Sequence, residues 1–331
     1  MKKFTKMIAI VLSFALCCAF FAGCGEKTPD NQKTEYKVGI IQYVSHPSLD
    51  NCYNGVVQAL GAEKGVTFDR QIGSDASPDS DCETYAKTFV ANKYDMIVAI
   101  ATPAAMSAFA AVEGTDIPVV FCAVNDPVKA ELVKSNEAPG YNCTGTSDVL
   151  DLSAQLELIQ SMQPDAKSVG ILYTTSEANS ISNLEKFKKL AADKNMTVDA
   201  VGIQNDADIP AAAGALAARV DCINNFTDNK VVNNLSIVLD AANANKIPVY
   251  GSEVEQVKNG CLAAVSIDYV ALGKVTGNMA LDIKNGADAS KMAVKTISDA
   301  EPVVNTEVLT ALSMELPAKY ADVEKVTTNK A

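Results

Sequence analysis

The sequence predicts an α/β protein built from two similar Rossmann-like lobes that are joined by a three-segment hinge. Short apolar runs alternate with amphipathic stretches of helix length, the runs are apolar at consecutive positions, and the second half of the chain repeats the pattern of the first. Alternating strands and helices favour a parallel sheet with helices on both faces. Strands of such a sheet are buried on both sides, which explains their continuous apolar character.

Each apolar run is expected to form a strand of one of the two sheets. The expected strands lie at residues 37–42, 66–71, 95–101, 117–122, 168–173, 197–203, 222–226, 247–250 and 261–266. The amphipathic stretches between them are expected to form helices. The clearest of these lie at residues 48–63, 79–92, 150–163, 178–193, 229–245 and 269–285.

The two halves of the chain match each other at an offset of about 130 residues. The matching segments are 37–42 with 167–173, 94–105 with 220–231, and 116–126 with 246–256. Three matches in the same order indicate two copies of one βα arrangement. One lobe should therefore resemble the other in topology.

The N-terminus has the features of an export signal. Lys2, Lys3 and Lys6 precede the apolar segment 7–21, which is too short to be a good membrane span. Phe21-Ala22-Gly23-Cys24 resembles the lipobox of bacterial lipoproteins, although Leu is usual where Phe21 stands. That resemblance implies cleavage after residue 23 and a diacylglyceryl group on Cys24. An ordinary secretory signal is the alternative.

These features predict how the chain is divided and where it works. Residues 1–23 would be the signal peptide, and the polar residues 24–36 would be a flexible tether from the lipid anchor. The protein would then be exported and held on the outer face of the bacterial cytoplasmic membrane. Only the lipid anchor would contact the membrane, because the body has no second apolar segment near 18 residues.

The composition argues against several classes of function. Without the three N-terminal lysines, 25 basic residues face 40 acidic ones, so nucleic acid is not expected as a partner. Six of the nine cysteines lie beyond the lipobox, and those in apolar runs are expected to be buried free thiols; disulfides are the alternative in an exported protein. A single histidine argues against a zinc site, so neither a metal nor a cofactor is expected.

The predicted topology indicates where a ligand would bind. Ligands of open α/β sheets bind beyond the carboxyl ends of the strands. If the two lobes face each other, the loops at these ends share one cleft. Those loops are 42–48, 102–105, 123–127, 174–179, 227–229 and 251–255. Several precede a helix, whose unpaired N–H groups and positive dipole end suit a carboxylate.

The order of short motifs in these loops resembles one protein family. The motifs are Q-Y-x-S-H-P-S-L-D at 42–50, A-T-P-A-A at 101–105, F-x-A-V-N-D-P at 121–127, T-D-N at 227–229 and D-Y-x-x-L-G at 268–273. Together they are similar to the substrate-binding lipoproteins of ABC importers, in the branch associated with tryptophan and tyrosine uptake. The resemblance extends from about residue 37 to 318.

The resemblance implies the type I periplasmic-binding fold, in which the chain crosses three times between the lobes. The crossings would lie near 144–148, 265–269 and 290–301. Lobe 1 would contain 37–146 plus 268–290, lobe 2 would contain 147–267 plus 300–320, and 321–331 would be a tail. The implied protein is a monomer that hands its ligand to an ABC permease and its ATPase.

The resemblance also implies an amino acid as ligand, with a large or aromatic side chain. Thr102 with the following N–H groups, and Ser147, would bind the carboxylate. Glu253 is the first candidate for the ammonium group, because an unpaired buried charge is costly; Asp228 and Asp126 follow. Tyr43 and His46 would flank the side chain. The candidate ligand-binding residues are Gln42, Tyr43, His46, Thr102, Pro103, Ala104, Asn125, Asp126, Ser147, Thr174, Ser176, Asn179, Thr227, Asp228, Glu253 and Asp268.

Each of these residues also has a purely structural interpretation. His46 with Pro47 is suited to cap the following helix, and Tyr43 to pack within its own lobe. Asp126 and Asp228 stand where aspartates commonly cap helices or turns. Asp268 is suited to hold the hinge without contacting a ligand.

Other functions fit the sequence less well. An enzyme is not expected, because there is no G-x-S-x-G elbow, no phosphate-binding P-loop and no HExxH motif. A sensory subunit for a membrane receptor would use the same tethered fold and stays open as an alternative. Binding of a sugar or nucleoside is a second alternative, which the absence of Trp disfavours because sugar sites usually stack aromatic rings on the ligand.

Overall fold

The computed structural model describes residues 35–297 and 300–329, so the expected signal peptide, the lipidation site Cys24 and nearly all of the tether lie outside the described residues. Contacts divide the chain into residues 1–35 and 36–331, and every described helix and strand belongs to the second unit. No helix in the described part of the chain is long and apolar enough to cross a bilayer.

Residues 36–331 contain two sheets, each at the centre of a lobe. Sheet 1, in lobe 1, has the order β11-β5-β4-β3-β1-β2, and its strands pair in parallel. Its strands are β1 (Tyr36–Gln42), β2 (Val66–Ile72), β3 (Met96–Ile100), β4 (Val119–Cys122), β5 (Cys143–Ser147) and β11 (Lys295–Thr296). Both faces are covered by helices, as the continuous apolar runs of β3 and β4 require.

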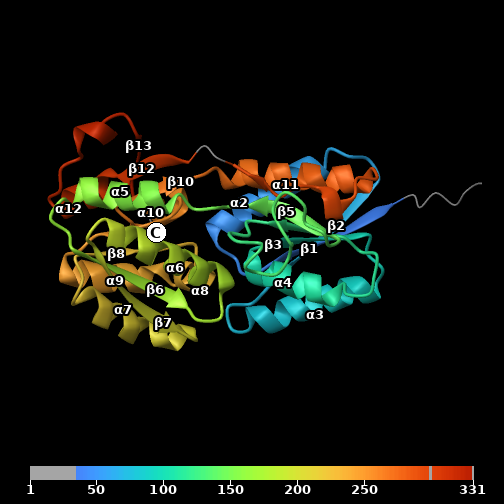
Figure 1. The fold of residues 1–331 in the computed structure, drawn as a ribbon, viewed down its shortest axis with the longest axis horizontal. Helices are drawn as coiled ribbons and strands as arrows, with labels where there is room; N and C mark the ends of the chain where they lie inside the picture. Colours follow the sequence, from blue (N-terminus) through green and yellow to red (C-terminus); the bar gives the residue numbers. More distant parts are fainter. Residues whose placement is uncertain (1–34, 298–299, 330–331) are drawn as a thin grey trace, which may run out of the picture. The chain divides into compact units, whose positions relative to one another are not determined.

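Four helices cover sheet 1. In Figure 1, α2 and α11 lie on one side of the sheet, and α3 and α4 lie on the other. The helices are α2 (Pro47–Leu60), α3 (Pro78–Ala91), α4 (Thr102–Ala111) and α11 (Tyr269–Lys284). Helix α11 comes from far along the chain, after the first five strands of lobe 2, so the chain returns to lobe 1 as expected before it completes lobe 2.

Sheet 2, in lobe 2, repeats this topology. Its order is β13-β12-β10-β9-β8-β6-β7, so the first five strands of each lobe follow the same sequence of neighbours. The strands are β6 (Ser168–Thr174), β7 (Thr197–Ile203), β8 (Cys222–Asn224), β9 (Val249–Tyr250), β10 (Ala263–Ser266), β12 (Glu301–Asn305) and β13 (Glu324–Val326). Only the pairing of β12 with β10 is antiparallel among the described pairs. This shared strand order is what the repeated sequence pattern predicted.

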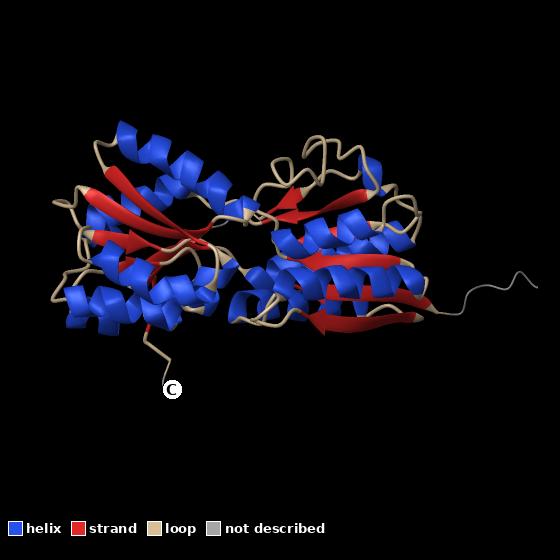
Figure 2. Ribbon diagram, turned by 90° about the horizontal axis from the view of Figure 1, so that it is seen from below, coloured by secondary structure: helices blue, strands red, loops and turns tan. Residues whose placement is uncertain are grey.

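Helices also cover both faces of sheet 2. Figure 2 shows helices lying against the strands of each lobe. The helices of lobe 2 are α5 (Leu152–Met162), α6 (Ala178–Asp193), α7 (Ile209–Ala217), α8 (Asn229–Asn233), α9 (Leu235–Asn245), α10 (Val254–Lys258) and α12 (Thr306–Ala311). Short 3₁₀ turns are η1 (Asp206–Asp208), η2 (Ala289–Lys291) and η3 (Ala318–Tyr320). Separate apolar clusters form under α5 and α6 and under α7 and α9.

The structure differs from the expected elements at four places. The first hinge crossing, expected near 144–148, is largely taken up by β5 (Cys143–Ser147). The single helix expected at 229–245 is two helices that meet at Asn234. Lobe 1 extends beyond residue 290, because β11 pairs with β5. The expected tail contains β13, which pairs with β12. In each case a tertiary contact, not a local pattern, decides the element.

Helices α2 and α11 cross very closely, and this contact positions one wall of the site described below. A Cβ atom at Gly55 would lie 2.1 Å from the carbonyl oxygen of Val270, and one at Gly273 would lie 2.1 Å from that of Cys52. Only glycine permits this approach, because any side chain would overlap the backbone of the other helix.

The six cysteines of the described residues are buried free thiols. They are Cys52, Cys82, Cys122, Cys143, Cys222 and Cys261. This arrangement corresponds to the expected small buried hydrophobes and not to the disulfide alternative.

Candidate functional site

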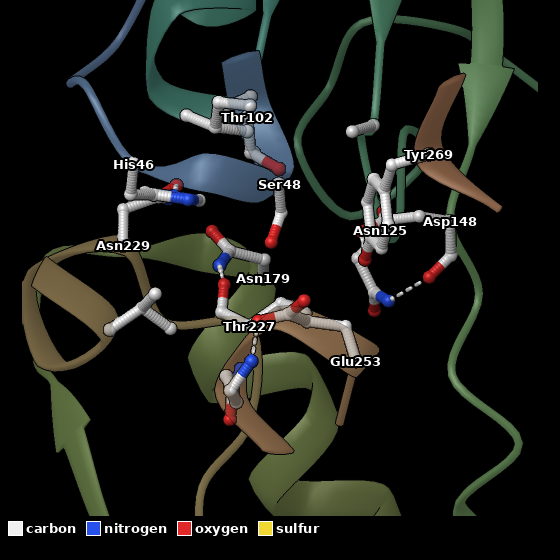
Figure 3. A pocket seen from close by; sticks show the side chains of 15 residues that line it. His46, Ser48, Thr102, Asn125, Asp148, Asn179, Thr227, Asn229, Glu253 and Tyr269 are labelled. Carbon is white, nitrogen blue, oxygen red and sulfur yellow. Dashed lines mark hydrogen bonds between the residues drawn. The ribbon is translucent and has the colours of Figure 1, made fainter. Parts of the chain in front are cut away.

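A cavity lies between the two lobes, at the carboxyl ends of their strands (Figure 3). The space between the side chains there, including the part that is open to solvent, is about 390 Å³. The lining residues are His46, Ser48, Leu49, Ala101, Thr102, Ala123, Asn125, Asp148, Asn179, Thr227, Asn229, Val232, Glu253, Gln256 and Tyr269. This is the location that the strand-end argument predicts.

Lobe 1 contributes the starts of two helices. His46 and Ser48 flank the first residue of α2, and Thr102 begins α4. Ala101 and Ala123 follow β3 and β4 with positive φ angles of 82° and 55°, which non-glycine residues rarely adopt. Such backbone strain is commonly found at binding sites, and these short side chains leave space beside the helix starts.

A second group of residues lies at the hinge. Asp148 follows β5 and is 4% exposed. Its Oδ2 atom accepts a hydrogen bond from the hydroxyl of Tyr269, the first residue of α11, at 3.1 Å. Its backbone carbonyl accepts from Nδ2 of Asn125 at 2.9 Å. The hinge therefore presents a carboxyl group that Tyr269 holds at one oxygen, on a backbone that Asn125 fixes.

Lobe 2 contributes amides and a second carboxylate. Asn179 lies in the first turn of α6, Asn229 begins α8, and Glu253 precedes α10. Nδ2 of Asn179 donates to the carbonyl of Thr227 at 3.1 Å. The two oxygens of Glu253 accept from the backbone N–H groups of Glu255 and Gln256, so Glu253 caps α10 while it lines the cavity.

Burial changes the protonation of the ionisable groups in the cavity. Burial raises the pKa of Asp148 to about 7 and the pKa of Glu253 to about 7. Burial also lowers the pKa of His46 to about 4, so its ring is neutral at pH 7. Among the described residues that line the cavity, none is Lys or Arg. The site therefore has acidic groups and no basic group that is charged at pH 7.

Four polar atoms of the cavity are buried and have no hydrogen-bond partner. They are Nδ1 of His46, Oγ of Ser48, Oδ1 of Asp148 and Oδ1 of Asn179. Buried polar atoms are nearly always paired, because an unpaired one costs about 1–3 kcal/mol. Their concentration in one cavity indicates a polar ligand that would supply the missing partners.

The structure brings six of the sixteen predicted ligand-binding residues together at this cavity. They are His46, Thr102, Asn125, Asn179, Thr227 and Glu253. His46 occupies the capping position before α2, but its side chain makes no capping bond. Instead, its Nε2 lies 3.4 Å from Oδ1 of Asn229, on the other lobe. The side chain of His46 therefore lines the cavity and does not make the capping bond of the structural interpretation.

The structure does not place Gln42 or Tyr43 in the lining of the cavity. Gln42 is buried beneath it, where Nε2 donates to the carbonyl of Val44 and Oε1 accepts from Arg70. Tyr43 is 2% exposed and packs in the core of lobe 1. Both residues support the loop that carries His46, because their side chains point into the lobe.

Asp126 and Asp228 have partners outside the cavity. Asp126 accepts hydrogen bonds from Ser182 and Lys186, both at 2.7 Å and both on α6 of the other lobe. Asp228 caps α8 and accepts from Thr174 and Ser180. These carboxylates already have full sets of donors, which explains why neither is directed at the cavity.

The remaining predicted residues also lie outside the lining. Ser147 donates to the carbonyl of Asn125, Asp268 caps α11, and Ser176 is exposed. Pro103 and Ala104 belong to the first turn of α4, where Ala104 is fully buried in the lobe. Only the position of Thr102 in that turn allows its side chain to reach the cavity.

Sequence reasoning missed several residues that lie in segments it had singled out. Ser48 and Asn229 belong to the motifs that contain His46 and Asp228, and Tyr269 begins the D-Y-x-x-L-G motif after Asp268. Asp148 lies in the first expected crossing. The motifs indicated the right segments, but which residue of each motif lines the cavity depends on the tertiary structure.

The arrangement is suited to hold a small molecule with a positive group at one end. Asp148 and Glu253 offer carboxylates for that group, while Ser48 and Thr102 at helix starts offer donors for a negative group. Among the described residues, no cluster of His, Cys, Asp and Glu could hold a metal ion.

Comparison with known proteins gives consistent results. Residues 37–323 match the family described as ABC transporter substrate binding protein. The chain is 36% identical to the "Tyrosine-binding protein" of Clostridioides difficile (strain R20291), over 95% of this chain and 94% of the relative.

Two solved structures are similar over most of the chain. One is an ABC domain in complex with L-Trp from Streptococcus pneumonia, with a TM-score of 0.84, 33% identity, and coverage of 88% of this chain and 99% of that chain. The other is the ligand-free, open structure of a substrate-binding protein with adhesive properties from Clostridium difficile. Its TM-score is 0.67 and its sequence identity is 37%. The alignment covers 89% of this chain and 100% of that chain.

Proposed function

Because the chain belongs to the ABC transporter substrate-binding protein family, we propose that it captures an aromatic amino acid outside the cell and presents it to an ABC permease and its ATPase. The observation that carries this proposal is the cavity itself, with two buried carboxyl groups and four unpartnered polar atoms between the lobes. Tyrosine and tryptophan are the leading candidates, because the two relatives above are a tyrosine-binding protein and a complex with L-Trp.

The three parts of an α-amino acid each have a complement in the cavity. The ammonium group would pair with Asp148 and Glu253, since a buried cation needs a carboxylate partner. The carboxylate would accept from the hydroxyls of Ser48 and Thr102 and from the N–H groups that begin α4. The ring would contact Leu49, Ala101, Ala123 and Val232, which are apolar.

The mechanism in this proposal is capture by closure of the two lobes. A ligand that touches both lobes favours the closed form, since it interacts with that form more strongly than with the open one. The TM-score of the structure is 0.84 with the L-Trp complex and 0.67 with the ligand-free, open relative, although the sequence identities are similar, at 33% and 37%. This difference supports a closed arrangement in which His46 and Asn229 meet across the cavity. No covalent step is part of the proposal.

Export and lipid anchoring belong to the same proposal. The N-terminal lysines, the apolar segment and Cys24 in its lipobox-like context support a signal peptide that is removed and a thiol that carries lipid. A receptor tethered at the outer face of the membrane would act as a monomer beside its permease. A sensory role and a sugar ligand are not favoured, because the relatives named above are transport proteins or amino-acid-binding proteins.

A thermal-shift screen of the twenty amino acids, with sugars and nucleosides as controls, tests this function. Tyrosine or tryptophan should raise the unfolding midpoint most, because a ligand of the native state stabilises it by mass action. Calorimetry should then give an affinity at least tenfold weaker for the Glu253→Gln variant. The matched control is Glu255→Gln, whose carboxylate pairs with Lys258 outside the cavity. No shift with any aromatic amino acid, or larger shifts with sugars, would refute the proposal.

A further inference from the structure

Glu177 is a buried carboxylate that lies behind the cavity wall and is not part of the lining. We propose that Glu177 sets the hydrogen-bonding polarity of the cavity, so that His46 Nδ1 and Asn179 Oδ1 both act as acceptors and the site selects an aromatic amino acid whose side chain carries a hydrogen-bond donor. This inference rests on the proposed function and names the feature of the ligand that the site distinguishes.

The first step is the orientation of two amides. Oε2 of Glu177 lies 2.8 Å from Nδ2 of Asn229 and 3.1 Å from Nδ2 of Asn179. The backbone N–H of Asn229 donates to the same oxygen at 3.1 Å. Burial, and then the nearby charge of Asp228, raise the pKa of the Glu177 carboxyl group to about 8. Its Oε2 nevertheless accepts the backbone N–H of Asn229, which can only donate, so this oxygen acts as an acceptor and both amide groups turn their NH₂ ends towards it. Their oxygens then point away from it.

The second step is the tautomer of His46. Its Nε2 lies 3.4 Å from Oδ1 of Asn229, which is an acceptor because the NH₂ end of this amide is bound to Glu177. Nε2 must therefore carry the hydrogen. Since burial keeps the ring neutral, Nδ1 has a free lone pair, and it has no partner in the protein. Glu177 orients Asn229, and Asn229 in turn makes Nδ1 of His46, on the opposite lobe, an acceptor.

The third step concerns Asn179. Its NH₂ end is shared between Glu177 and the carbonyl of Thr227, so its hydrogens are occupied. Oδ1 is buried and unpartnered, and Asn179 lines the cavity. The cavity therefore contains two neutral acceptors that no donor of the protein satisfies.

The position of His46 assigns its acceptor to the side chain of the ligand. In Figure 3, His46 and Asn229 lie on one side of the cavity, Asp148, Asn125 and Tyr269 lie on the other, and Asn179 lies between His46 and Glu253. The ammonium group needs the charged carboxylates of Asp148 and Glu253, which leaves Nδ1 of His46 for the far end of the ligand and Oδ1 of Asn179 between the two. The phenol O–H of tyrosine and the indole N–H of tryptophan are donors there, whereas phenylalanine has none.

A site with buried acceptors should discriminate strongly against a ligand without the donor. The single hydrogen of a phenol O–H or indole N–H would pair one of these two acceptors, whereas phenylalanine would leave both Nδ1 of His46 and Oδ1 of Asn179 unpaired and shut off from water. The same effect gives enzymes their strong rejection of substrate analogues that lack a hydrogen-bonding group.

The first experiment uses the unaltered protein. Calorimetry should show that the better of tyrosine and tryptophan binds at least tenfold more tightly than phenylalanine or 4-fluorophenylalanine, which has similar size but no donor. Equal binding of tyrosine, tryptophan and phenylalanine would overturn this inference while leaving the proposed function intact. Failure of all four to bind would refute the proposed function, and the inference with it.

The second experiment uses the fact that His46 is the only histidine in the chain. A long-range ¹H–¹⁵N correlation spectrum contains one imidazole, and it should show the tautomer with hydrogen on Nε2. The better-binding donor ligand should shift the Nδ1 resonance, and phenylalanine should not. The other tautomer in the ligand-free protein would contradict the inference.

The third experiment replaces the carboxylate. Glu177→Gln adds a donor that lets the two amides turn around, so affinity for the donor ligand should fall at least tenfold while affinity for phenylalanine changes less than threefold. The matched control is Glu157→Gln, an exposed glutamate of the same lobe that pairs with Lys319. Equal losses for both ligands would show a merely structural role. If the variant fails to fold, the spectrum and the ligand series of the unaltered protein still decide the question.

Discussion

At the scale of single residues, the carboxyl group of Asp148 has an unusual environment. It lies at the hinge, it is almost fully buried, and Oδ1 has no partner while Oδ2 accepts from Tyr269. Burial raises the pKa of its side chain to about 7, well above that of an exposed aspartate near 3.9. In the empty protein this carboxyl group is therefore partly protonated at neutral pH.

The raised pKa of Asp148 makes both the stability of the fold and the affinity for a ligand depend on pH, because folding and ligand binding are linked to proton binding. A raised pKa in the folded state means that the contribution of Asp148 to stability is fully present below about pH 4 and is lost as the pH rises through about 7. A bound ammonium group favours the charged carboxylate, so ligand binding should release a proton in this range. Glu253 faces the same cavity with a similarly raised pKa, while His46 stays neutral above its lowered pKa.

Ligand affinity should accordingly rise by about tenfold for each such carboxyl group between pH 6 and pH 8. Calorimetry at several pH values, in buffers of different ionisation enthalpy, measures both the affinity and the protons released. Asp148→Asn should weaken binding and reduce the pH dependence without removing it, because Glu253 remains. An affinity of the unaltered protein that does not change between pH 6 and pH 8 would contradict this assignment of the ammonium group.

At the scale of elements, the crossing of α2 and α11 positions several of the lobe 1 residues that line the cavity. The first turn of α2 holds Ser48 and Leu49, and Tyr269 begins α11. Gly55 and Gly273 bring the two helices into backbone contact. The separation of the helices therefore determines how far Tyr269 reaches towards Asp148.

Gly273→Ala should disturb both the fold and the site. The new Cβ would lie 2.1 Å from the carbonyl oxygen of Cys52, so the helices must separate. We expect a loss of about 1–3 kcal/mol in the free energy of unfolding, together with weaker ligand binding. Denaturant titration and calorimetry measure these two quantities.

The matched control for this variant is Gly214→Ala in α7. A Cβ at Gly214 would meet no atom within 4 Å, and this glycine lies within a helix. Alanine there should raise stability by up to about 1 kcal/mol, as its helix propensity is higher. A Gly273→Ala protein as stable as Gly214→Ala would show that the close crossing is not required.

At the scale of the whole body, contacts around the cavity hold the two lobes together. Asp126 of lobe 1 accepts from Ser182 and Lys186 of lobe 2 at 2.7 Å. Asp75 of lobe 1 accepts from Asn233 of lobe 2 at 2.9 Å. These polar contacts lie outside the cavity lining, so they favour closure without selecting a ligand.

Asp126→Asn should shift the protein towards an open form. Because the ion pair is partly exposed, its loss should reduce ligand affinity only about two- to fivefold. Small-angle scattering of the empty variant should give a larger radius of gyration, and saturating ligand should restore the compact value. Glu83→Gln, which breaks the exposed Glu83–Lys87 pair within α3, is the control. Unchanged affinity and scattering would mean that this contact does not influence closure.

Local patterns were sufficient for nine strands, β1–β4 and β6–β10, and for most of the helices of both lobes, but β5 and β12 were missed although their residues are largely buried. The helix at 178–193 and the strand at 197–203 have the bounds that the apolar periodicity predicts. By contrast, β11 and β13 are short and mostly exposed, and they exist only because a neighbouring strand offers its edge. A pattern of buried residues cannot reveal a strand that buries so little.

For the site, the sequence by itself determined which loops meet, because the carboxyl ends of parallel strands always lie at one edge of a sheet. Only the tertiary structure decided which side chain of each loop faces the cavity. Asp228 and Asn229 are adjacent in sequence, yet the aspartate caps α8 and the asparagine reaches His46. A polar side chain at a helix start can bond its own backbone or a ligand, and its choice depends on partners that are distant in sequence.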